Sequence, residues 1–592
     1  MKSAWGHLEH SLLPKPSTPS PADQAHHTKT NGTHKENMTT LSTILSSGTT
    51  MANAPALITP SIMPPPTRPI IEPNEACKLA TIVATIGPAS DSPEMVRKLI
   101  DVGVGVFRLN FSHGTLEAHA KRLTTIRSTA AAMHRTVAVL GDLQGPKIRV
   151  GKIPEGVGER ARSGGGSAML EAGQDVVLSA TATDAFFRPS NNGTGTELVL
   201  PLTYAPMVHE VEPGQRILIN DGAIRMLAVE CDTKAQELRC RVTVGGLVTS
   251  GKGINLPESN ISAPALSEHD LSCMKWAVEN DLDYLALSFV RKAEEVEDLR
   301  RRVAALPDPA SPGEPAWIPI ISKVEKPQAV KNLESIVAAS DGVMVARGDL
   351  GVEMDIAKVP VVQKQIIELC RQYGKPSIVA TQMLETMIDS PIPTRAEASD
   401  VANAVFDGAD AVMLSAETAT GKHPALVVET MSRIIAVAEA HVRTLTSTPM
   451  APIQFIAGHR GTAALAHGAF TIARDLAAKV VVVWSQHGGT ARYLSQNRLN
   501  MPILAYSSSP RAARRMSLYR GVMPICCQPP GNGTLSDWNA AVDVEVQVRG
   551  LAHVGDAIVL LAGRPLGQAK ATNTIAIHKV GEQASGYRAH KA

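Results

Sequence analysis

Eight short apolar runs, each followed by a helical pattern, constrain the fold of this chain more than any other feature. The runs are rich in β-branched residues and lie at 79–87, 104–112, 136–142, 283–289, 317–325, 342–349, 376–382 and 410–417. Continuous apolar runs separated by helices are typical of parallel strands that are buried on both faces. Eight of them in series predict a (β/α)8 barrel, and an open doubly wound sheet is the alternative that the pattern leaves open.

Polar residues end each of the eight runs. In (β/α)8 barrels the C-terminal ends of the strands form the active site. We therefore expect a functional site where these side chains meet. They are Thr85, Asn110, Ser112, Asp142, Ser288, Lys323, Glu325, Arg347, Asp349, Thr381, Ser415 and Glu417.

Two further units accompany the predicted barrel, whose segments are 77–149 and 264–446. Between them, residues 150–263 form short alternating runs with Gly- and Pro-containing turns, which predict a small all-β domain inserted in a barrel loop. At that position the inserted domain would act as a lid. Residues 447–585 return to an α/β pattern, which predicts a third domain with a parallel sheet, followed by a tail at 586–592.

Residues 1–76 differ in composition from the rest of the chain. They are rich in Pro, Ser, Thr, His and Asn and show little hydrophobic periodicity. Such a segment buries too little apolar surface to offset its ordering entropy, so we expect a disordered extension. The alternative is a start codon assigned too far upstream. The internal candidates for the true start are Met38, Met51 and Met63.

The composition excludes several classes of function. A net charge of +2 and an aromatic content of 3% do not favour nucleic-acid binding. No apolar run approaches the roughly 18 residues that a membrane span requires. The seven cysteines are odd in number and scattered, which favours reduced thiols in a cytoplasmic protein over a zinc site or disulfides.

Two neighbouring strand ends combine an ammonium with two carboxylates. Lys323 and Glu325 are two positions apart, so a strand presents both on one face. Asp349 ends the next run. Two carboxylates from neighbouring strands suit Mg²⁺, and Lys323 could then counter the charge of a transferred phosphoryl group. An ordinary Lys–Glu ion pair is the alternative.

The ends of the second and third runs add cations and polar groups. Together they suit a small, multiply anionic substrate, since Arg binds phosphate through its planar fork. No GxxxxGK[ST] loop is present, so a nucleotide would bind by another geometry. The residues concerned are Arg108, Asn110, Ser112, His113, Lys147 and Arg149.

Seven segments resemble the pyruvate kinase family, and the resemblance covers about 77–585. They are RLNFSHG (108–114), DLQGPKIR (142–149), ISKVEKP (321–327), VMVARGDLGVE (343–353), ATQMLETM (380–387), PTRAEASDVANAV (393–405) and DGADAVMLSAET (407–418). The family has a barrel with an inserted β lid and a C-terminal α/β domain. Its reaction is the last step of glycolysis, in which phosphoenolpyruvate phosphorylates ADP to give pyruvate and ATP.

The resemblance also implies roles for single residues. Glu325 and Asp349 would hold Mg²⁺, for which Mn²⁺ could substitute. Lys323 would stabilise the phosphoryl group in transfer, and Arg108 would be a second clamp on it. The substrate carboxylate would bind at Gly348, Asp349 and Thr381, and Thr381 would also be near the point of enolate protonation. The residues that would face the nucleotide are Asn110, His113, Arg149 and Lys252.

Two other functions stay open at this point. A lyase acting on phosphoenolpyruvate or pyruvate could use a similar barrel and metal, although it would lack the inserted lid. A catalytically silent relative is the second alternative, although each position considered carries a competent residue.

The segment DLQGPKIR departs from a common family pattern, DTKGPE. In that pattern the Asp and Thr, with an Asn and a Ser, bind K⁺ near the phosphate. This chain keeps Asn110, Ser112 and Asp142 but has Leu143, and Lys147 replaces the acidic residue. The variant resembles the family branch that works without K⁺, with the Lys147 ammonium in place of the ion. The alternative is that K⁺ still binds to what is otherwise a vestigial site.

The C-terminal domain contains a candidate effector site. Gly488, Gly489 and Thr490 open a predicted helix after an apolar run, with Ser485 and Arg492 nearby. Backbone amides at a helix N-terminus can bind phosphate. The resemblance implies a phosphorylated effector, AMP or a sugar phosphate, and a homotetramer. An ordinary strand-to-helix turn is the alternative.

Overall fold

The computed structural model describes residues 78–155, 157, 166–190, 195–445, 455–456, 458–531, 534–563, 566–568 and 572–582. The predicted N-terminal extension and C-terminal tail lie outside the described residues. The domain boundaries stay predictions.

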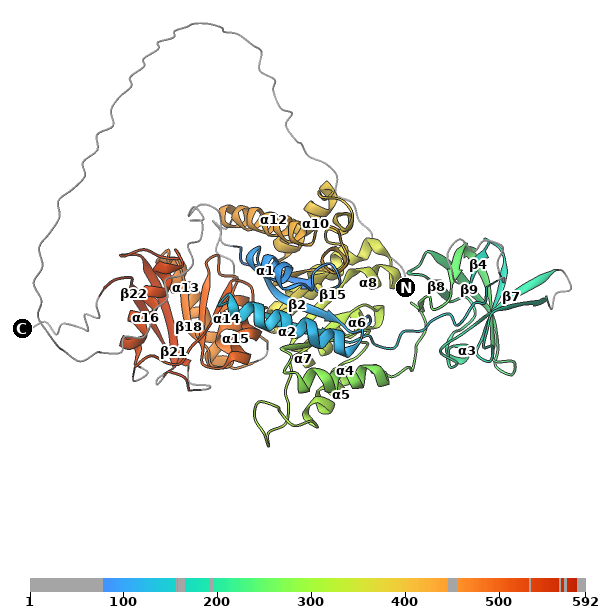
Figure 1. The fold of residues 1–592 in the computed structure, drawn as a ribbon, viewed down its shortest axis with the longest axis horizontal. Coiled ribbons are helices and arrows are strands. Elements are labelled where there is room, and N and C mark those ends of the chain that lie inside the picture. The colour runs from blue at the N-terminus through green and yellow to red at the C-terminus, as the bar shows by residue number, and fades with distance from the viewer. Residues whose placement is uncertain are drawn as a thin grey trace, which may run out of the picture. The chain divides into compact units, whose positions relative to one another are not determined.

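A closed barrel of eight parallel strands lies at the centre of the fold (Figure 1). Its strands are β1 (Thr81–Thr85), β2 (Val104–Asn110), β3 (Ala138–Asp142), β13 (Tyr284–Leu287), β14 (Ile320–Val324), β15 (Gly342–Ala346), β16 (Ser377–Ala380) and β17 (Ala411–Leu414). They follow one another around the barrel in chain order, and β17 pairs with β1. The predicted (β/α)8 barrel is therefore confirmed, and the open sheet is excluded.

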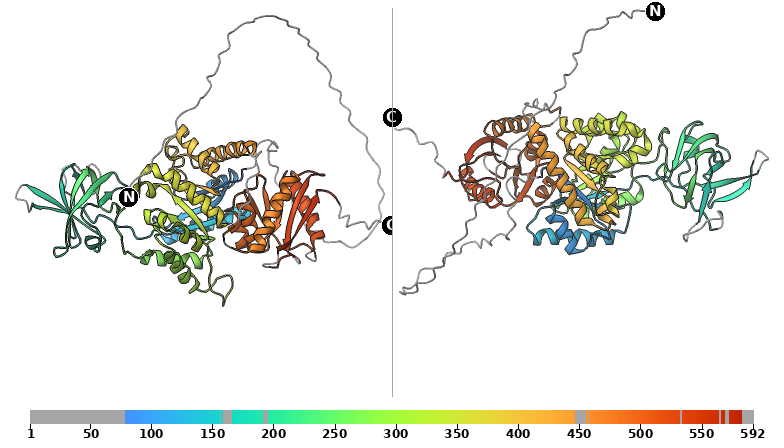
Figure 2. Two further views of the ribbon diagram at one scale, coloured as in Figure 1. Left: turned by 180° about the vertical axis from the view of Figure 1, so that it is seen from behind. Right: turned by 90° about the horizontal axis from the view of Figure 1, so that it is seen from above.

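Helices surround the barrel strands, as both views of Figure 2 show. The helices are α1 (Pro93–Asp101), α2 (Leu116–Ala132), α4 (Glu268–Glu279), α5 (Ala293–Ala304), α6 (Pro327–Lys331), α7 (Leu333–Ala339), α8 (Arg347–Glu353), α9 (Val359–Gln372), α10 (Arg395–Asp407), α11 (Ala416–Ala419) and α12 (Pro424–Leu445), with 3-10 turns η1 (Ile356–Lys358) and η2 (Glu385–Ile388). Side-chain caps begin several of them, because a hydroxyl oxygen accepts from a free N–H of the first turn. Thr394, for example, forms a capping box with Glu397 at the start of α10.

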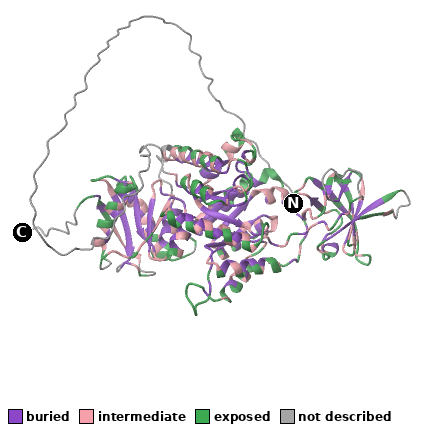
Figure 3. Ribbon diagram, in the orientation of Figure 1, coloured by how far each residue is buried: buried purple, intermediate pink, exposed green. Residues whose placement is uncertain are grey.

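The barrel strands carry apolar side chains on both faces, towards the interior and towards the helices. The strands are buried along their length, as Figure 3 shows in purple. Side chains such as Val83, Leu140 and Met344 fill the interior, while Ile82 and Val345 pack against the helices. This two-sided burial explains why the runs are continuous rather than alternating.

The chain between β3 and β13 forms the predicted inserted domain. Its strands are β4 (Ser167–Leu170), β5 (Asp175–Ser179), β6 (Phe186–Pro189), β7 (Thr196–Pro201), β8 (Arg216–Ile219), β9 (Ile224–Asp232), β10 (Glu237–Val244), β11 (Gly246–Thr249) and β12 (Ile254–Asn255). Seven strands form one sheet in the order β12-β8-β9-β10-β5-β7-β6, and β11 pairs with β4. One short helix, α3 (Met207–Glu210), interrupts the strands that the sequence predicts. The domain has an apolar core of its own.

The C-terminal domain is a five-stranded sheet with helices on both faces. Its elements are α13 (Arg460–Asp475), β18 (Val481–Trp484), α14 (Gly489–Gln496), β19 (Ile503–Ser507), α15 (Pro510–Met516), β20 (Val522–Cys526), α16 (Leu535–Val548), β21 (Ala557–Gly563) and β22 (Thr572–Lys579). The strand order is β20-β19-β18-β21-β22. The prediction of a parallel sheet is wrong for the edge strand β22, which pairs antiparallel with β21.

The segment that follows α15 closes the N-terminal end of the barrel. Leu518 is 1% exposed and belongs to the apolar cluster of the barrel interior. The Tyr284 hydroxyl donates to the carbonyl of Arg515 at 2.6 Å, and the Thr81 hydroxyl donates to the carbonyl of Ser517 at 3.1 Å. Arg514 adds ion pairs of 2.7 Å to Asp283 and to a second aspartate.

Two features of the described residues bear on the compositional predictions. No helix among them combines the length and the apolar character that a membrane crossing needs. The cysteines in this part of the chain are free thiols.

Candidate active site

Lys323 is the centre of a charged cluster at the C-terminal end of the barrel. Its ammonium donates to the Ser288 hydroxyl at 2.8 Å and lies 2.9 Å from Glu325 Oε1 and 3.4 Å from Asp142 Oδ1. Burial by itself lowers the pKa of Lys323, but the charges of Asp142 and Glu325 outweigh it and raise the pKa above its ordinary value. The side chain therefore carries a fixed positive charge.

Arg108 lies on the other side of Asp142. Its Nε donates to Asp142 Oδ2 at 2.7 Å, and a second guanidinium nitrogen donates to the Thr85 hydroxyl at 3.0 Å. Asp142 is 1% exposed, and burial would raise its pKa, but Lys323 and Arg108 together lower it. The carboxylate thus holds two cations beside each other, an arrangement that suits a dianionic phosphoryl group.

Glu325 is a buried carboxylate whose charge is incompletely compensated. Its Oε2 accepts from the amide of Phe289 at 2.5 Å, whereas Oε1 contacts Lys323 as an ion pair but accepts no aligned hydrogen bond. Burial raises the pKa of Glu325 to about 7, and the nearby charge of Asp349 adds to this increase. A divalent cation would relieve both effects, so the two carboxylates fit Mg²⁺.

The donor set also agrees with a metal that takes part of its coordination from the substrate. Among the residues that the structure describes, no cluster of three or more His, Cys, Asp or Glu side chains could hold a metal ion. Mg²⁺ is commonly bound by one or two carboxylates and completes its coordination with phosphate oxygens and water.

Hydrogen bonds join the start of α8 to the turn after β16. The amide of Gly348 donates to Thr381 Oγ1 at 2.7 Å, and this hydroxyl donates to the carbonyl of Ala380 at 2.6 Å. Thr381 has a φ of +69°, which is strained for a β-branched residue. Arg347 fixes the strained turn by donating to the Thr381 carbonyl at 2.8 Å and to Asp400 at 2.7 Å. The Gly348 amide is thus already engaged.

The predicted nucleotide residues come from two domains. Asn110 is the last residue of β2, where its side-chain oxygen accepts from the amide of Ser112 at 3.2 Å, and His113 is exposed. Arg149, the last residue of the first predicted barrel segment, and Lys252 on the inserted domain are both half-buried. A guanidinium nitrogen of Arg149 donates to the carbonyl of Gly251 at 2.8 Å, so these two cations lie at neighbouring positions.

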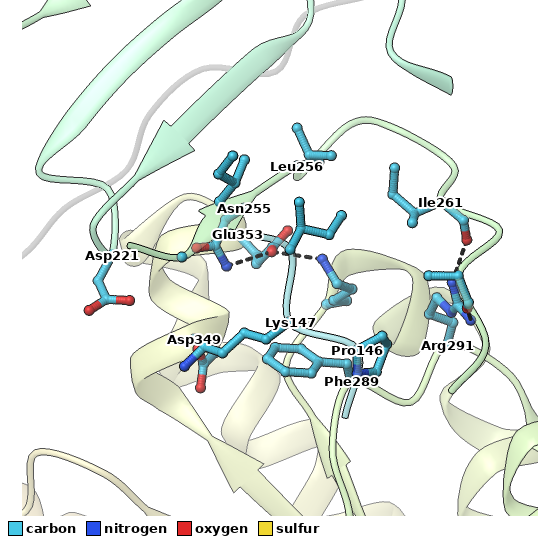
Figure 4. A pocket seen from close by; sticks show the side chains of 15 residues that line it. Pro146, Lys147, Asp221, Asn255, Leu256, Ile261, Phe289, Arg291, Asp349 and Glu353 are labelled. Atoms are coloured by element: carbon cyan, nitrogen blue, oxygen red, sulfur yellow. Dashed lines mark hydrogen bonds and ion pairs between the residues drawn. The ribbon is translucent and has the colours of Figure 1, made fainter. Parts of the chain in front are cut away.

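A pocket lies between the inserted domain and the barrel (Figure 4). Its lining includes Asp221 and Asn255 from the inserted domain and Asp349 and Glu353 from α8. Lys147 also lines it and extends in the direction of Asp349 in this view. The pocket therefore joins the predicted metal site to the inserted domain.

Two residues of the predicted monovalent-cation site, Leu143 and Asp142, already contact other side chains. Leu143 is 1% exposed and belongs to the barrel core, and its carbonyl accepts from the Ser288 hydroxyl at 2.6 Å. Both carboxylate oxygens of Asp142 face cationic side chains. Lys147 is exposed.

The predicted effector residues surround the start of α14. Gly488 has a φ of +81° and precedes the first helical residue, Gly489. Ser485 and Thr490 are buried; Ser485 Oγ accepts from the amide of Ala491 at 3.2 Å, and Thr490 Oγ1 lies 2.9 Å from Thr572 Oγ1. The Arg492 guanidinium stacks on the ring of Tyr493, at 5.3 Å from its centroid.

The sequence analysis included Ser288 among the strand-end residues without a specific role, and it gave Glu353 no role. Ser288 bonds Lys323 and Leu143, and the signal available for it was its place at the end of the fourth run. Glu353 is buried and bonds two residues of the pocket lining, and only its buried charge within VMVARGDLGVE could have drawn attention to it.

Comparisons with known proteins cover the barrel and the C-terminal domain. The barrel-domain model of pyruvate kinase matches residues 77–428, and its alpha/beta-domain model matches 463–578. The chain is 39% identical over 503 residues to a pyruvate kinase of Corynebacterium efficiens, covering 85% of this chain and 98% of that protein. It is 38% identical over 507 residues to a pyruvate kinase of Mycobacterium tuberculosis, with the same coverage. The crystal structure of a pyruvate kinase from Cryptosporidium parvum has a TM-score of 0.74 and 32% identity, covering 85% of this chain and 96% of that one.

Proposed function

This chain belongs to the pyruvate kinase family and is an enzyme of that kind, and we propose that it transfers the phosphoryl group of phosphoenolpyruvate to ADP at the cluster around Lys323. The observation that carries this assignment is the pair of largely buried cations, Lys323 and Arg108, held on either side of Asp142. The products are pyruvate and ATP.

The transfer step depends on charge placement rather than covalent catalysis. In this proposal the Lys323 ammonium follows the phosphoryl group from the enol oxygen to ADP. Arg108 would bind the same group from β2, on the other side of Asp142. Both cations are oriented before the substrate arrives, because Asp142 and Ser288 hold them. Fixed charges of this kind need no reorganisation in the transition state, which makes them effective in phosphoryl transfer.

The family requires Mg²⁺ in general, and Glu325 and Asp349 are the residues that would hold it here, with Mn²⁺ as a possible substitute. When bound, the metal supplies positive charge to the substrate oxygens. Gly348 and Thr381 would receive the substrate carboxylate. Since the Gly348 amide donates to Thr381 Oγ1 in this structure, we infer that substrate binding exchanges that hydrogen bond. The freed oxygen could then accept from a water molecule and hold it near the enolate carbon.

Asn110, His113, Arg149 and Lys252 would bind the nucleotide. Lys252 on the inserted domain, and Arg149 bridged to that domain at Gly253, would reach ADP phosphates from the side opposite Asn110 and His113. This division explains why a lid is needed, since closing it over the nucleotide would exclude water from the transferred group.

A coupled lactate dehydrogenase assay tests the assignment. We expect pyruvate formation that needs phosphoenolpyruvate, ADP and Mg²⁺ together. Pyruvate released without ADP would indicate a lyase instead, and no turnover with either substrate would indicate a silent relative.

We further propose that the enzyme works without K⁺. The Leu143 side chain supplies no oxygen ligand, and both carboxylate oxygens of Asp142 already face cations. Lys147 brings an additional positive charge to the neighbouring pocket. A tethered ammonium at this position could replace the charge of a bound ion.

The test measures activity in a buffer free of sodium and potassium. We expect nearly full activity there, and a gain in K⁺ dependence for Lys147→Glu. Lys121→Glu, at an exposed position of α2, controls for the change of net charge. A large loss of wild-type activity that K⁺ restores would reject the proposal.

Regulation through α14 is a separate proposal. A phosphorylated effector, AMP or a sugar phosphate, would bind near Ser485, Gly488, Gly489, Thr490 and Arg492. A side chain at Gly489 would extend into open space, so Gly489→Asp should repel phosphate without a steric clash. Gly461 is equally open in the first turn of α13, which makes Gly461→Asp a matched control. The assay compares phosphoenolpyruvate saturation curves with and without AMP and sugar mono- or bisphosphates.

The resemblance also leads us to propose a homotetramer acting in the cytoplasm, where glycolysis supplies its substrate. Sedimentation of the purified protein tests the oligomeric state.

A further inference from the structure

Glu353 is a buried carboxylate that the reaction does not account for. It is the last residue of α8 and is 1% exposed. Its Oε1 accepts from the Lys326 ammonium at 2.7 Å and from the side-chain amide of Asn255 at 2.9 Å (Figure 4). Its Oε2 is buried and has no hydrogen-bond partner.

These contacts connect three parts of the active site. Asn255 ends β12, the strand that returns the chain from the inserted domain, and Lys252 lies three residues before it. Lys326 directly follows the proposed metal ligand Glu325. Glu353 itself lies on the short helix that begins at Arg347 and contains Asp349.

A second contact of the inserted domain falls beside the first. The turn between β8 and β9 has three successive residues with positive φ, ending at Gly222. A Cβ atom at Gly222 would lie 3.5 Å from a methyl group of Val352, the neighbour of Glu353. The inserted domain therefore meets the C-terminal end of α8 at two adjacent residues.

The two partners of Glu353 differ in charge, and this difference matters when the lid moves. Leaving a buried carboxylate without a cation is costly, whereas a neutral amide contributes only a hydrogen bond. Because Lys326 belongs to the barrel, it remains paired with Glu353 whether or not Asn255 is present. The Asn255 contact can thus break and form again without exposing an uncompensated charge.

We infer that Glu353 is a positioning residue that docks the lid. The hydrogen bond from Asn255 fixes β12 on α8 and so sets how far Lys252 and Arg149 reach over the nucleotide. Arg149 shares this dependence because it forms a β-bridge with Gly253, two residues before Asn255. Glu353 touches no substrate in this role. The inference rests on the proposed nucleotide-binding function of those two cations.

The test begins with Asn255→Ala, which removes the lid contact and leaves the Lys326 ion pair in place. We expect KM for ADP to rise about tenfold, since a hydrogen bond to a charged group contributes roughly that factor. The values of kcat and of KM for phosphoenolpyruvate should stay within about twofold. The matched control is Asn280→Ala, which removes a 2.9 Å bond from an Asn side chain at the end of α4.

A double-mutant cycle assigns the effect to Glu353. In a Glu353→Ala background, Asn255→Ala should add almost nothing to KM for ADP, because its partner is already absent. Additive effects would overturn the inference. Should Glu353→Ala fail to fold, amide hydrogen exchange at Ile254 and Asn255 replaces the cycle. Exchange there should be faster in Asn255→Ala, and an unchanged rate would reject the docking role.

The outcomes also separate this inference from the proposed function. Absence of turnover in the wild-type enzyme would reject the function itself. Normal wild-type turnover with an Asn255→Ala KM for ADP equal to that of Asn280→Ala would reject the docking role alone.

Discussion

Replacing Asp142 by Asn should make catalysis sensitive to alkaline pH. In the wild-type enzyme the charge of Asp142 is the largest of the effects that raise the pKa of Lys323. An Asn side chain keeps the shape of the residue and removes that charge. The ammonium of Lys323 is then left with Glu325 as its main anion and with Arg108 as an uncompensated cation nearby.

The size of the effect follows from the contacts. Removing one member of a buried ion pair typically costs about 3–5 kcal/mol, and one pH unit corresponds to about 1.4 kcal/mol. Because burial by itself favours the neutral amine, we expect the pKa of Lys323 to fall by about 2 units or more. Activity that depends on the charged amine would be present below the new pKa and lost as the pH rises through it.

The assay is the dependence of kcat/KM for phosphoenolpyruvate on pH, from about 7 to 10.5, where free Lys titrates. The alkaline loss of activity should begin at a lower pH in Asp142→Asn than in the wild-type enzyme. Ser288→Ala serves as the control, because it removes a neutral partner of Lys323 at 2.8 Å and changes no charge. An identical alkaline limb in Asp142→Asn and wild type would refute the electrostatic account of the cluster.

Three further predictions follow from single contacts. Lys323→Met should lower turnover at least about 1000-fold while phosphoenolpyruvate binding persists, because losing a cation at the transferred phosphoryl group has effects of that size. The measurement is single-turnover kinetics, and near-normal transfer would contradict the role of Lys323. Asp349→Asn should raise the Mg²⁺ concentration for half-maximal activity at least about tenfold, and an unchanged Mg²⁺ titration would exclude it as a ligand. Burial raises the pKa of Asp410 from 3.8 to about 6, so its ionisation destabilises the fold above that pH and not below 3.8. Asp410→Asn loses one acceptor at every pH, because the two carboxylate oxygens accept from the Ser377 amide at 2.8 Å and from the Gln496 side-chain amide at 2.7 Å. Its free energy of unfolding relative to wild type should still rise by up to about 3 kcal/mol between pH 4 and 7, and a pH-independent difference would contradict the raised pKa of Asp410.

The parts of the molecule with a strong local pattern could be predicted from sequence. The barrel strands are buried on both faces, so their runs are continuous and easily recognised. The two-residue spacing of Lys323 and Glu325 likewise predicts neighbouring side chains, and their charged atoms lie 2.9 Å apart. Both inferences rely on geometry within a few residues.

Contacts set by the packing of distant segments could not be predicted. Ser288 reaches Lys323 because β13 pairs with β14 in one particular register around the barrel. β22 pairs antiparallel with its neighbour β21, and strand periodicity does not record direction. Glu353 bonds a lid residue 98 positions away, which no local spacing indicates.

The closure of the barrel by Leu518 has a consequence for the order of synthesis. The last barrel strand ends at Leu414, and the side chain that completes the interior at the opposite end comes 104 positions later. A nascent chain that has released all eight strands still lacks this side chain, so the apolar side chains that Leu518 covers have no partner at that end until residue 518 has emerged. A copy cut off after α12 would therefore lose part of its own core.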